Sequence, residues 1–302
     1  MTYNIFLVDS CDPGIMAEAL AEIFQVPVME VDVADADGDQ GNRYWDALVS
    51  CECSRVYGNV SLSLDIYAQD SVKHQPTEAQ FCAALARRIG TPVLYPPQES
   101  PISAHSLVTP EGVVTRARLD ETEDEDPSFT VTAVEAFIEN LPDVPVAHLP
   151  EVVREQKIAM PLSDSFAEAF KALADSDGGP EHLAAAAEVA EVVRVAGSYL
   201  GAWEKLARRT EGNWGPSGWF PLEFYRETLG YRDDIEGCLR QLPENVALLC
   251  KRYLDKVDSL YKELTVEDEE HVVVDDLDEP TAGSVQKAWW WYRRPEPMPW
   301  ES

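Results

Sequence analysis

Two carboxylates near the N-terminus have the side chains that metal-dependent or nucleophilic chemistry uses. Asp9 and Asp12 follow the apolar run Tyr3–Val8, which predicts a short buried strand. A carboxylate at the end of such a strand can bind a cation or act as a nucleophile. Asp12 also precedes Pro13, and an acidic N-cap followed by proline is typical of a helix start. Both interpretations stand, and the helix cap is the one that the local sequence favours.

A second acidic group, Asp35-Ala-Asp-Gly-Asp39, resembles the start of a calcium-binding loop. An EF-hand loop needs glycine at its sixth position and a bidentate glutamate at its twelfth, between two helices. Here these positions hold Gln40 and Asp46, and the flanking residues have the pattern of strands. We therefore expect an acidic loop between strands and no specific calcium site.

The residues that nucleophilic catalysis requires do not form a known motif. None of the five histidines lies in a Ser-His or Cys-His context, and no GxSxG, HExxH, P-loop or GxGxxG string occurs. Cys51 and Cys53 flank Glu52 on one face of a predicted strand, but no CxxC motif accompanies them. We expect the six cysteines to be reduced core residues, and the sequence identifies no catalytic residue, resident metal or cofactor.

Acidic residues concentrate in two short segments, at 120–126 and at 267–279. Such runs are either solvated loops or surfaces that imitate the spacing of nucleic-acid phosphates and occlude a basic site with strong electrostatic steering. The candidate partner-binding acids are Asp120, Glu121, Glu123, Asp124, Glu125, Asp126, Glu267, Asp268, Glu269 and Glu270.

Tryptophans lie close to these segments or in glycine-rich sequence, where they can supply desolvated anchors that charge alone does not provide. Trp214 and Trp219 belong to the stretch Gly212–Phe220, and Trp289, Trp290 and Trp291 are consecutive. Each group has two interpretations, packing in the core or an aromatic patch that faces a partner.

The net charge excludes some classes of partner. The 302 residues carry 24 Lys and Arg against 55 Asp and Glu, a formal charge of −31, and both halves of the chain are acidic. Unaided binding to DNA, RNA or an anionic membrane face would work against this field. A basic protein partner is favoured. The N-terminus has no signal-peptide pattern and no apolar run approaches the length of a membrane span, so we expect a cytoplasmic protein.

The first half of the sequence alternates strand and helix patterns. Thr77-Glu-Ala-Gln80 forms a capping box that opens a helix to Ile89, and period-two alternation at Val60–Ala68 predicts one arm of a hairpin. A short helix is expected at Ala133–Asn140. This pattern predicts an α+β fold with a mixed or antiparallel sheet layered with helices over residues 1–140.

The second half has helical periodicity. After a Pro-rich linker at 141–150, the sequence predicts a helical-bundle domain at 151–264, with helices that include 164–174, one ending near Arg209, 221–229 and 233–242. The helix that follows Pro243 has the clearest apolar spacing. Residues 265–302 form an acidic and Trp/Pro-rich C-terminal segment.

One segment resembles a known family. The string from Glu78 to Tyr95, with the hairpin at Leu107–Val113, is similar to a pattern in actinobacterial proteins of the polymorphic-toxin immunity type. This resemblance implies a protein that neutralises a toxin, and it carries over no catalytic residue.

Three functional hypotheses follow. The first is a non-enzymatic acidic binding or inhibitor protein, an immunity factor that occludes the basic site of a cationic toxin or nuclease. The second is a metal-dependent enzyme with a site at Asp9 and Asp12. The third is an adaptor whose helical domain docks onto another helix bundle.

Overall fold

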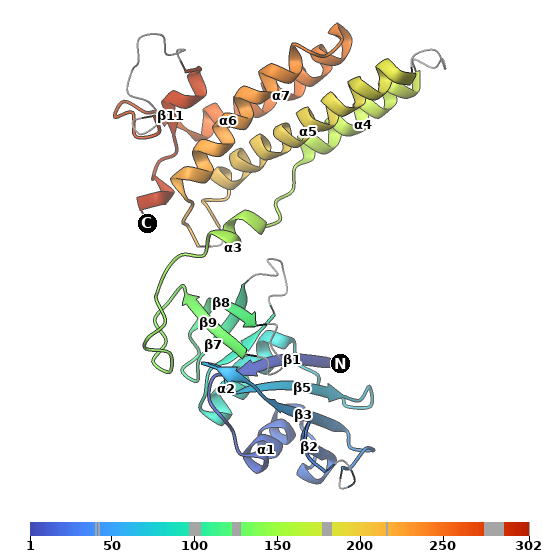
Figure 1. The fold of residues 1–302 in the computed structure, drawn as a ribbon, viewed down its shortest axis with the longest axis vertical. Helices are drawn as coiled ribbons and strands as arrows, with labels where there is room; N and C mark the ends of the chain where they lie inside the picture. The colour runs from blue at the N-terminus through green and yellow to red at the C-terminus, as the bar shows by residue number, and fades with distance from the viewer. Residues whose placement is uncertain are drawn as a thin grey trace. The chain divides into compact units, whose positions relative to one another are not determined.

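The chain forms two compact units, Met1–Gln156 and Lys157–Ser302, in the computed structural model (Figure 1). The structure describes residues 1–39, 41, 43–96, 104–122, 128–176, 183–215, 217–274 and 287–301. A large mixed sheet with helices makes up the first unit, and long helices make up most of the second. The predicted α+β class, with helices following the sheet, is therefore confirmed.

All named strands of the first unit belong to one sheet. They are β1 (Thr2–Leu7), β2 (Val31–Asp35), β3 (Val49–Arg55), β4 (Tyr57–Gly58), β5 (Leu62–Ala68), β6 (Val93–Tyr95), β7 (His105–Val108), β8 (Val114–Thr122) and β9 (Ser128–Val134). The helices of this unit are α1 (Pro13–Phe24), α2 (Glu78–Ile89) and α3 (Pro150–Glu155), with a 3-10 turn at Val28–Glu30.

The centre of the sheet has split β-α-β topology. Strand order is β2-β3-β5-β1-β6-β7-β8-β9-β4, and β1 lies between β5 and β6, antiparallel to both. Helix α1 follows β1 and α2 connects β5 to β6, so two β-α-β crossings interleave in one sheet. The strand β2 adds in parallel to β3, which makes the sheet mixed.

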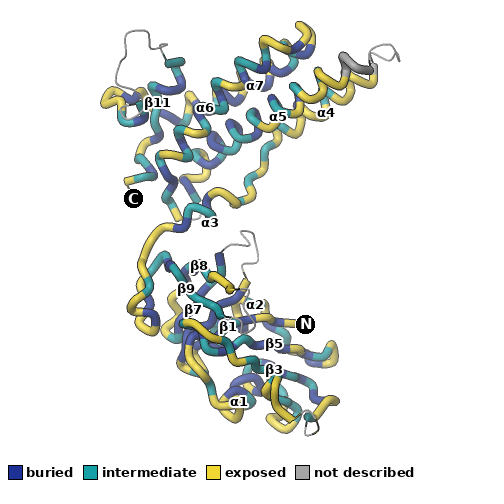
Figure 2. Tube along the Cα trace, viewed as in Figure 1, coloured by how far each residue is buried: buried dark blue, intermediate teal, exposed yellow. Residues whose placement is uncertain are grey.

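Each face of the sheet has its own core. Tyr3, Ile5 and Leu7 alternate along β1 and pack in one cluster with residues of α1 and α2. The ring of Tyr3 lies 4.4 Å from that of Phe81 in α2, centroid to centroid. Residues of β6 to β9 form a second cluster with Val8. Along β1 and β5 buried residues alternate with more exposed ones, so these strands bury mainly the face that packs against α1 and α2 (Figure 2).

The last strand pair bends the sheet and depends on a glycine. Gly58 has φ of +108°, and a Cβ built on it would lie 2.1 Å from the carbonyl oxygen of Phe129 in β9. The neighbouring Asn59 extends the pairing with its side chain: its amide nitrogen donates to Val131 O at 2.9 Å and its oxygen accepts from Val131 N at 2.6 Å. The β3–β5 connection is thereby fixed against β9.

Several local predictions are confirmed. The Asp12 carboxylate accepts hydrogen bonds from Gly14 N and Ile15 N at the start of α1. Thr77 and Gln80 form the reciprocal capping box of α2, and Gly90 ends that helix in the left-handed conformation. Strands β3 and β5 pair as an antiparallel hairpin, with β4 between them.

The helix expected at Ala133–Asn140 is wrong. Ala133 and Val134 end β9, and the chain then turns, with Leu141 N donating to Ile138 O. Val134, Ile138 and Leu141 are all buried in the second core. They reach the same core from a strand end followed by a turn.

The Pro-rich stretch 141–150 packs against the first unit. Leu141 and Leu149 are buried, and Val134 exchanges backbone hydrogen bonds with Pro145 and Ala147. The division between the units falls after Gln156.

The second unit contains four long helices and a C-terminal segment. The helices are α4 (Pro161–Ser176), α5 (Leu183–Glu211), α6 (Leu222–Leu239) and α7 (Glu244–Leu264). The short elements are β10 (Val266–Glu267), β11 (Arg293–Arg294), and 3-10 turns at Trp289–Tyr292 and Pro299–Glu301.

Helix α6 replaces the two helices expected at 221–229 and 233–242. A single buried stripe runs along it through Tyr225, Leu229, Arg232, Ile235 and Cys238. Gly230 lies within this helix and does not interrupt it. The guanidinium of Arg232 is paired inside the bundle, so the helix continues.

Among the helices in the described ranges, none combines the length and the apolar character that crossing a bilayer requires.

Substitution of Gly58 tests the closure of the sheet. We expect Gly58→Ala to lower the free energy of unfolding of the first unit by more than the ~1–2 kcal/mol that a left-handed backbone costs an L-residue, because the new Cβ also meets the Phe129 carbonyl. Hydrogen exchange of peptides covering β4 and β9, with urea denaturation of the full chain, measures the effect.

The matched control is Gly112→Ala. Gly112 has φ of +88° but no atom within 4 Å of an added Cβ, so this variant reports the backbone cost alone. Equal losses for the two variants would contradict a steric role for Gly58.

Candidate functional site

The structure brings the second acidic segment and the tryptophan run side by side. Val266 pairs with Arg294 and Glu267 with Arg293 in the antiparallel ladder of β10 and β11. Asp268 N continues this pairing by donating to Tyr292 O at 2.9 Å. The residues just after α7 and those after Trp289 therefore form the two sides of one surface feature.

A cleft of about 470 Å³ lies beside this ladder. Its lining residues are Lys262, Glu267, Asp268, Glu269, His271, Trp289, Tyr292 and Arg293. We call it the acidic–aromatic cleft. It combines carboxylates with the flat faces of two aromatic rings.

The acids of the cleft have different roles. Glu267, Glu269 and the adjacent Glu270 are exposed. Asp268 is only 2% exposed; its carboxylate accepts a hydrogen bond from Val273 N at 2.9 Å and lies 3.6 Å from Arg294 Nε. Asp268 therefore holds the turn after β10, and the three glutamates carry charge to the surface.

The aromatic wall already interacts with a cation. Trp289 is half-buried, and the Lys262 ammonium lies 4.0 Å from the centroid of its indole ring. Tyr292 is also half-buried, with its ring centroid 5.8 Å from that of His271. The cleft thus contains, within the chain, a contact between a cation and an aromatic face.

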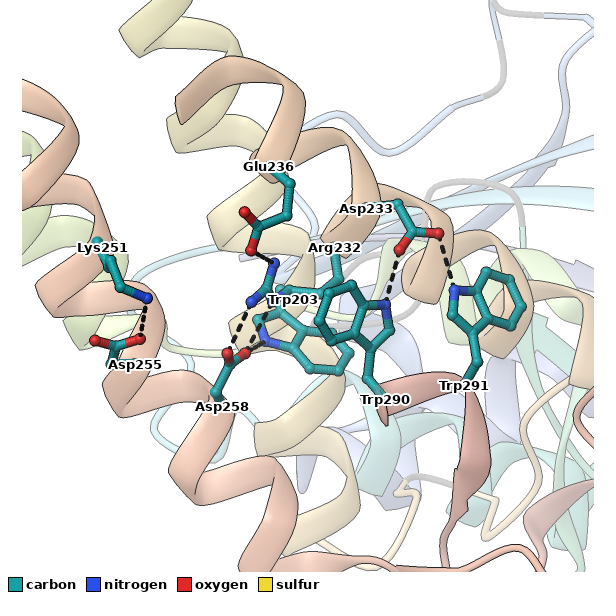
Figure 3. A network of polar contacts seen from close by, with 9 residues as sticks. All are labelled: Trp203, Arg232, Asp233, Glu236, Lys251, Asp255, Asp258, Trp290 and Trp291. Atoms are coloured by element: carbon teal, nitrogen blue, oxygen red, sulfur yellow. Dashed lines mark hydrogen bonds and ion pairs between the residues drawn. The ribbon is translucent and has the colours of Figure 1, made fainter. Parts of the chain in front are cut away.

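The other tryptophans of the run lie in the core. Trp290 and Trp291 are 5% and 4% exposed, and their indole nitrogens donate to the two carboxylate oxygens of Asp233 at 3.0 and 2.8 Å (Figure 3). Of their two interpretations, Trp290 and Trp291 therefore fit packing in the core and not an exposed aromatic patch, and Asp233 satisfies the one polar atom of each ring.

A buried ion pair supports this packing. The Arg232 guanidinium donates to both oxygens of Asp258 at 2.9 Å, and Trp203 Nε1 donates to the same carboxylate at 2.9 Å (Figure 3). Arg232 also lies 4.1 Å from the ring centroid of Trp290. Burial by itself would lower the pKa of Arg232, but the hydrogen bonds to Asp258 outweigh it and raise that pKa. The Arg232 guanidinium therefore stays charged inside the bundle.

Two buried tyrosine hydroxyls make a further polar contact next to the tryptophan run 289–291. Tyr225 and Tyr261, both fully buried, are hydrogen-bonded to each other, and Tyr225 donates to Arg293 O at 3.1 Å. Burial and the neighbouring hydroxyl raise the pKa of Tyr225 well above its usual value. These contacts connect α6 and α7 to the strand β11.

The aromatic residues of the glycine-rich stretch 212–220 are buried or half-buried. Trp214 is 3% exposed, and its ring centroid lies 5.1 Å from that of Phe220. Trp219 is half-buried. The interpretation of Trp214 as part of an exposed patch is therefore corrected, because its indole belongs to the core of the second unit.

The first acidic segment lies in the other unit. Asp120 and Glu121 are exposed near the end of β8. Glu123, Glu125 and the residues between and beside them, Asp124 and Asp126, lie outside the described residues.

The carboxylates proposed for an enzyme are both engaged. Asp9 Oδ2 accepts hydrogen bonds from Thr91 Oγ1 at 2.9 Å and from Asn140 Nδ2 at 2.8 Å, while Asp12 caps α1. The described part of the chain shows no group of three or more His, Cys, Asp or Glu side chains placed to hold a metal ion. The arrangement of Asp9 and Asp12 is that of residues that fix loops.

Residues that the sequence analysis missed complete the site. Lys262, His271, Tyr292 and Arg293 line the cleft. His271 has φ of +57°, which places it in a tight turn. A signal was available for Lys262, since it belongs to the last turn of the helix that ends just before the acidic segment.

No protein-family model, curated protein or solved structure matches the chain. The interpretation of the site depends on its geometry.

Removal of the buried carboxylate tests what supports the cleft. We expect Asp258→Asn to lower the free energy of unfolding of the second unit by ~3–5 kcal/mol, because it leaves the Arg232 guanidinium buried without its counter-charge. Denaturation followed by tryptophan fluorescence measures the loss, since seven of the eight tryptophans lie in this unit.

The control is Asp255→Asn, on the same helix and with the same change of charge. Asp255 and Lys251 form an exposed pair with both side chains 57% exposed (Figure 3). Such a pair contributes only ~0.3–0.5 kcal/mol. A loss for Asp258→Asn no larger than that of the control would contradict the supporting role.

Proposed function

We propose that this protein is a non-enzymatic acidic binding protein that holds a cationic protein partner at the acidic–aromatic cleft. The observation that supports this function is the convergence of two exposed glutamates, Glu267 and Glu269, with the side chains of Trp289 and Tyr292 in one cleft of the second unit, next to the exposed Glu270. A carboxylate and an aromatic face together favour guanidinium or ammonium side chains, because both stabilise a positive charge.

The overall charge suits the same partner. A formal charge of −31 accelerates the approach of a basic protein and disfavours nucleic acids. Charge alone provides steering but little specificity. The half-buried Trp289 supplies an anchor of the kind that dominates binding energy at interfaces.

The contact between Lys262 and Trp289 indicates how binding proceeds. In the free chain the Lys262 ammonium covers one face of the indole at 4.0 Å. A basic side chain of the partner competes with this internal cation for the ring and for the carboxylates of Glu267 and Glu269. Binding of an external cation to Trp289 therefore requires the loss of one internal contact, that between Lys262 and Trp289.

The finer form of the proposal is an immunity factor that neutralises a cationic toxin or nuclease in the cytoplasm. A nuclease groove is basic because it binds phosphates, and an acidic protein occludes it. All six cysteines are free, which suits a reducing compartment. The exposed Asp120 and Glu121 of the first unit would add to the acidic surface offered to such a partner.

The alternatives have weaker support. For an enzyme at the end of β1, the carboxylates of Asp9 and Asp12 are already occupied by hydrogen bonds within the chain. For a helical adaptor, a shallow cleft of about 550 Å³ between α4 and α5 offers apolar side chains such as Phe170 and Val193. That cleft carries no feature that selects a partner.

Neutralisation of the glutamates tests the cleft. With a synthetic arginine-rich peptide as probe at ~0.15 M salt, we expect Glu267→Gln/Glu269→Gln/Glu270→Gln to weaken binding at least tenfold. Lys262→Met should strengthen binding because it removes the internal competitor. Fluorescence anisotropy of the labelled peptide measures both effects and their dependence on salt.

The control triple variant is Glu168→Gln/Glu188→Gln/Glu244→Gln, which removes the same charge from exposed positions on α4, α5 and the start of α7. It should retain nearly all of the affinity. Equal weakening by the two triple variants would show that only net charge matters, and the cleft would lose its role.

A growth assay tests the immunity hypothesis. Genes adjacent to the one that encodes this chain are expressed singly in bacteria, and a toxic product is then co-expressed with the wild-type chain or the cleft triple variant. We expect growth to recover with the wild type and not with the variant. Equal rescue by both chains, or the absence of any rescued toxic product, would exclude immunity through the cleft.

A further inference from the structure

A second cleft, in the first unit, is lined by two thiols. It has a volume of about 580 Å³ and lies among the β1–α1 turn, the ends of β2 and β3, and β4. Cys11 and Cys53 are half-buried on its wall. Apolar residues such as Met16 and Leu62 make up much of the remaining surface. Small solutes therefore have a path to both sulfur atoms.

Behind this wall lies a third thiol in direct contact with one of the two. Cys51 Sγ and Cys53 Sγ are 3.7 Å apart, and Cys51 is fully buried. The two residues are separated by Glu52 and lie on one face of β3, where side chains of alternate residues point the same way. The pair consists of one accessible thiol and one protected thiol.

The electrostatic surroundings make the two thiols unequal. A hydrogen bond from Cys51 lowers the pKa of Cys53, with help from the Arg43 guanidinium, against the opposing effects of burial, Asp35 and Glu52. The same hydrogen bond and burial raise the pKa of Cys51. Thiolates are the reactive form of cysteine, so the accessible member of the pair is also the more reactive one.

The remaining cysteines provide a contrast. Cys82 in α2 is fully buried, and burial raises its pKa. Burial likewise raises the pKa of Cys250 in α7, to about 11. Neither lines the cleft. We therefore expect the Cys53 thiol to be more reactive than the thiols of Cys82 and Cys250.

Strand geometry allows a bond between the two sulfurs and limits its stability. Residues two apart on a strand have Cα atoms about 6.4–6.8 Å apart, which is the upper end of the range that a disulfide spans. Their sulfurs already face each other. A bond formed there would hold strain, and strained disulfides are the labile, reversible ones.

We propose that Cys51 and Cys53 form a peroxide-oxidisable dithiol, in which Cys53 reacts through the cleft and Cys51 then closes a reversible disulfide. In the first step the Cys53 thiolate attacks hydrogen peroxide, giving the sulfenic acid and hydroxide as the O–O bond breaks. In the second step the Cys51 sulfur attacks the sulfenic sulfur and water leaves. The two thiols lose two electrons in total, and the peroxide accepts them.

Formation of the disulfide would change the geometry of β3, the strand that carries both cysteines. Cys51 pairs with Val33 and Cys53 with Asp35 in the parallel β2–β3 ladder, and Ala36 N donates to Cys53 O at 2.9 Å. Drawing the two Cα atoms together shortens β3 locally and weakens this pairing. The strand β2 and the adjacent Ala36 are therefore the residues expected to respond to oxidation.

Peroxide treatment of the intact protein, followed by alkylation and peptide mass spectrometry, tests the proposal. We expect two of the six thiols to be lost, linked as Cys51–Cys53, and to return with dithiothreitol. Hydrogen exchange should rise in residues 31–36. In Cys51→Ser the sulfenic acid on Cys53 should persist and react with dimedone, and in Cys53→Ser the dimedone adduct should disappear.

Two controls separate this site from general thiol oxidation. Cys82→Ser should leave the Cys51–Cys53 bond unchanged, and so should Cys11→Ser, because Cys11 is outside the contacting pair. A disulfide joining Cys11 to Cys53, or oxidation of Cys53 no faster than that of Cys82, would overturn the proposal. If a variant fails to fold, the position of the disulfide in the oxidised wild-type protein still tests the proposal.

Discussion

The second unit depends on one buried charge pair, Asp258 with Arg232. Two buried charges are stable only when they are paired and their hydrogen-bonding groups have partners. Here the Asp258 carboxylate accepts hydrogen bonds from two nitrogens of Arg232, Nε and Nη2, and from Trp203 Nε1. These residues belong to α5, α6 and α7, so the pair fixes three helices at once (Figure 3). Through the stacking of Arg232 on Trp290, it also fixes the C-terminal segment that forms one wall of the cleft.

Other arginine side chains of this protein are also paired with acids or buried. Arg43 pairs with Asp32 and Glu52 in the first unit, and Arg294 lies against Asp268 in the second. Arg209 is buried over the ring of Phe220, and burial lowers its pKa to about 10. Each of these arginines therefore makes its contacts within the chain.

Local signals were sufficient for the elements whose stability is local. The Asp12 cap, the Thr77 capping box and the β3–β5 hairpin follow from neighbouring residues alone, and the structure contains all three. Predictions that depended on distant contacts were less accurate. The helix expected at Ala133–Asn140 is one of them, because Val134 and Ile138 reach a core that is built from strands distant in the sequence.

The candidate site also combines features that local sequence predicts with features that depend on distant contacts. The acidic segment and the tryptophan run were identified from composition, but their proximity arises from the β10–β11 ladder, whose two-residue strands leave no periodic signal. Burial then separated residues that look alike in the sequence: Asp268 from its glutamate neighbours, and Trp290 and Trp291 from Trp289. Such distinctions depend on which side chain faces the helices, and that is a tertiary property.

The short ends of the large sheet have a consequence for how the protein behaves at high concentration. Open sheet edges attract further strands from other molecules, and that pairing begins aggregation. At one edge β4 is only two residues long and includes Gly58. At the other edge β2 spans five residues and carries Asp32 and Asp35. The short β4 offers few unpaired amides and β2 carries acidic side chains, so both edges disfavour strand pairing between copies and protect this sheet against fibril growth.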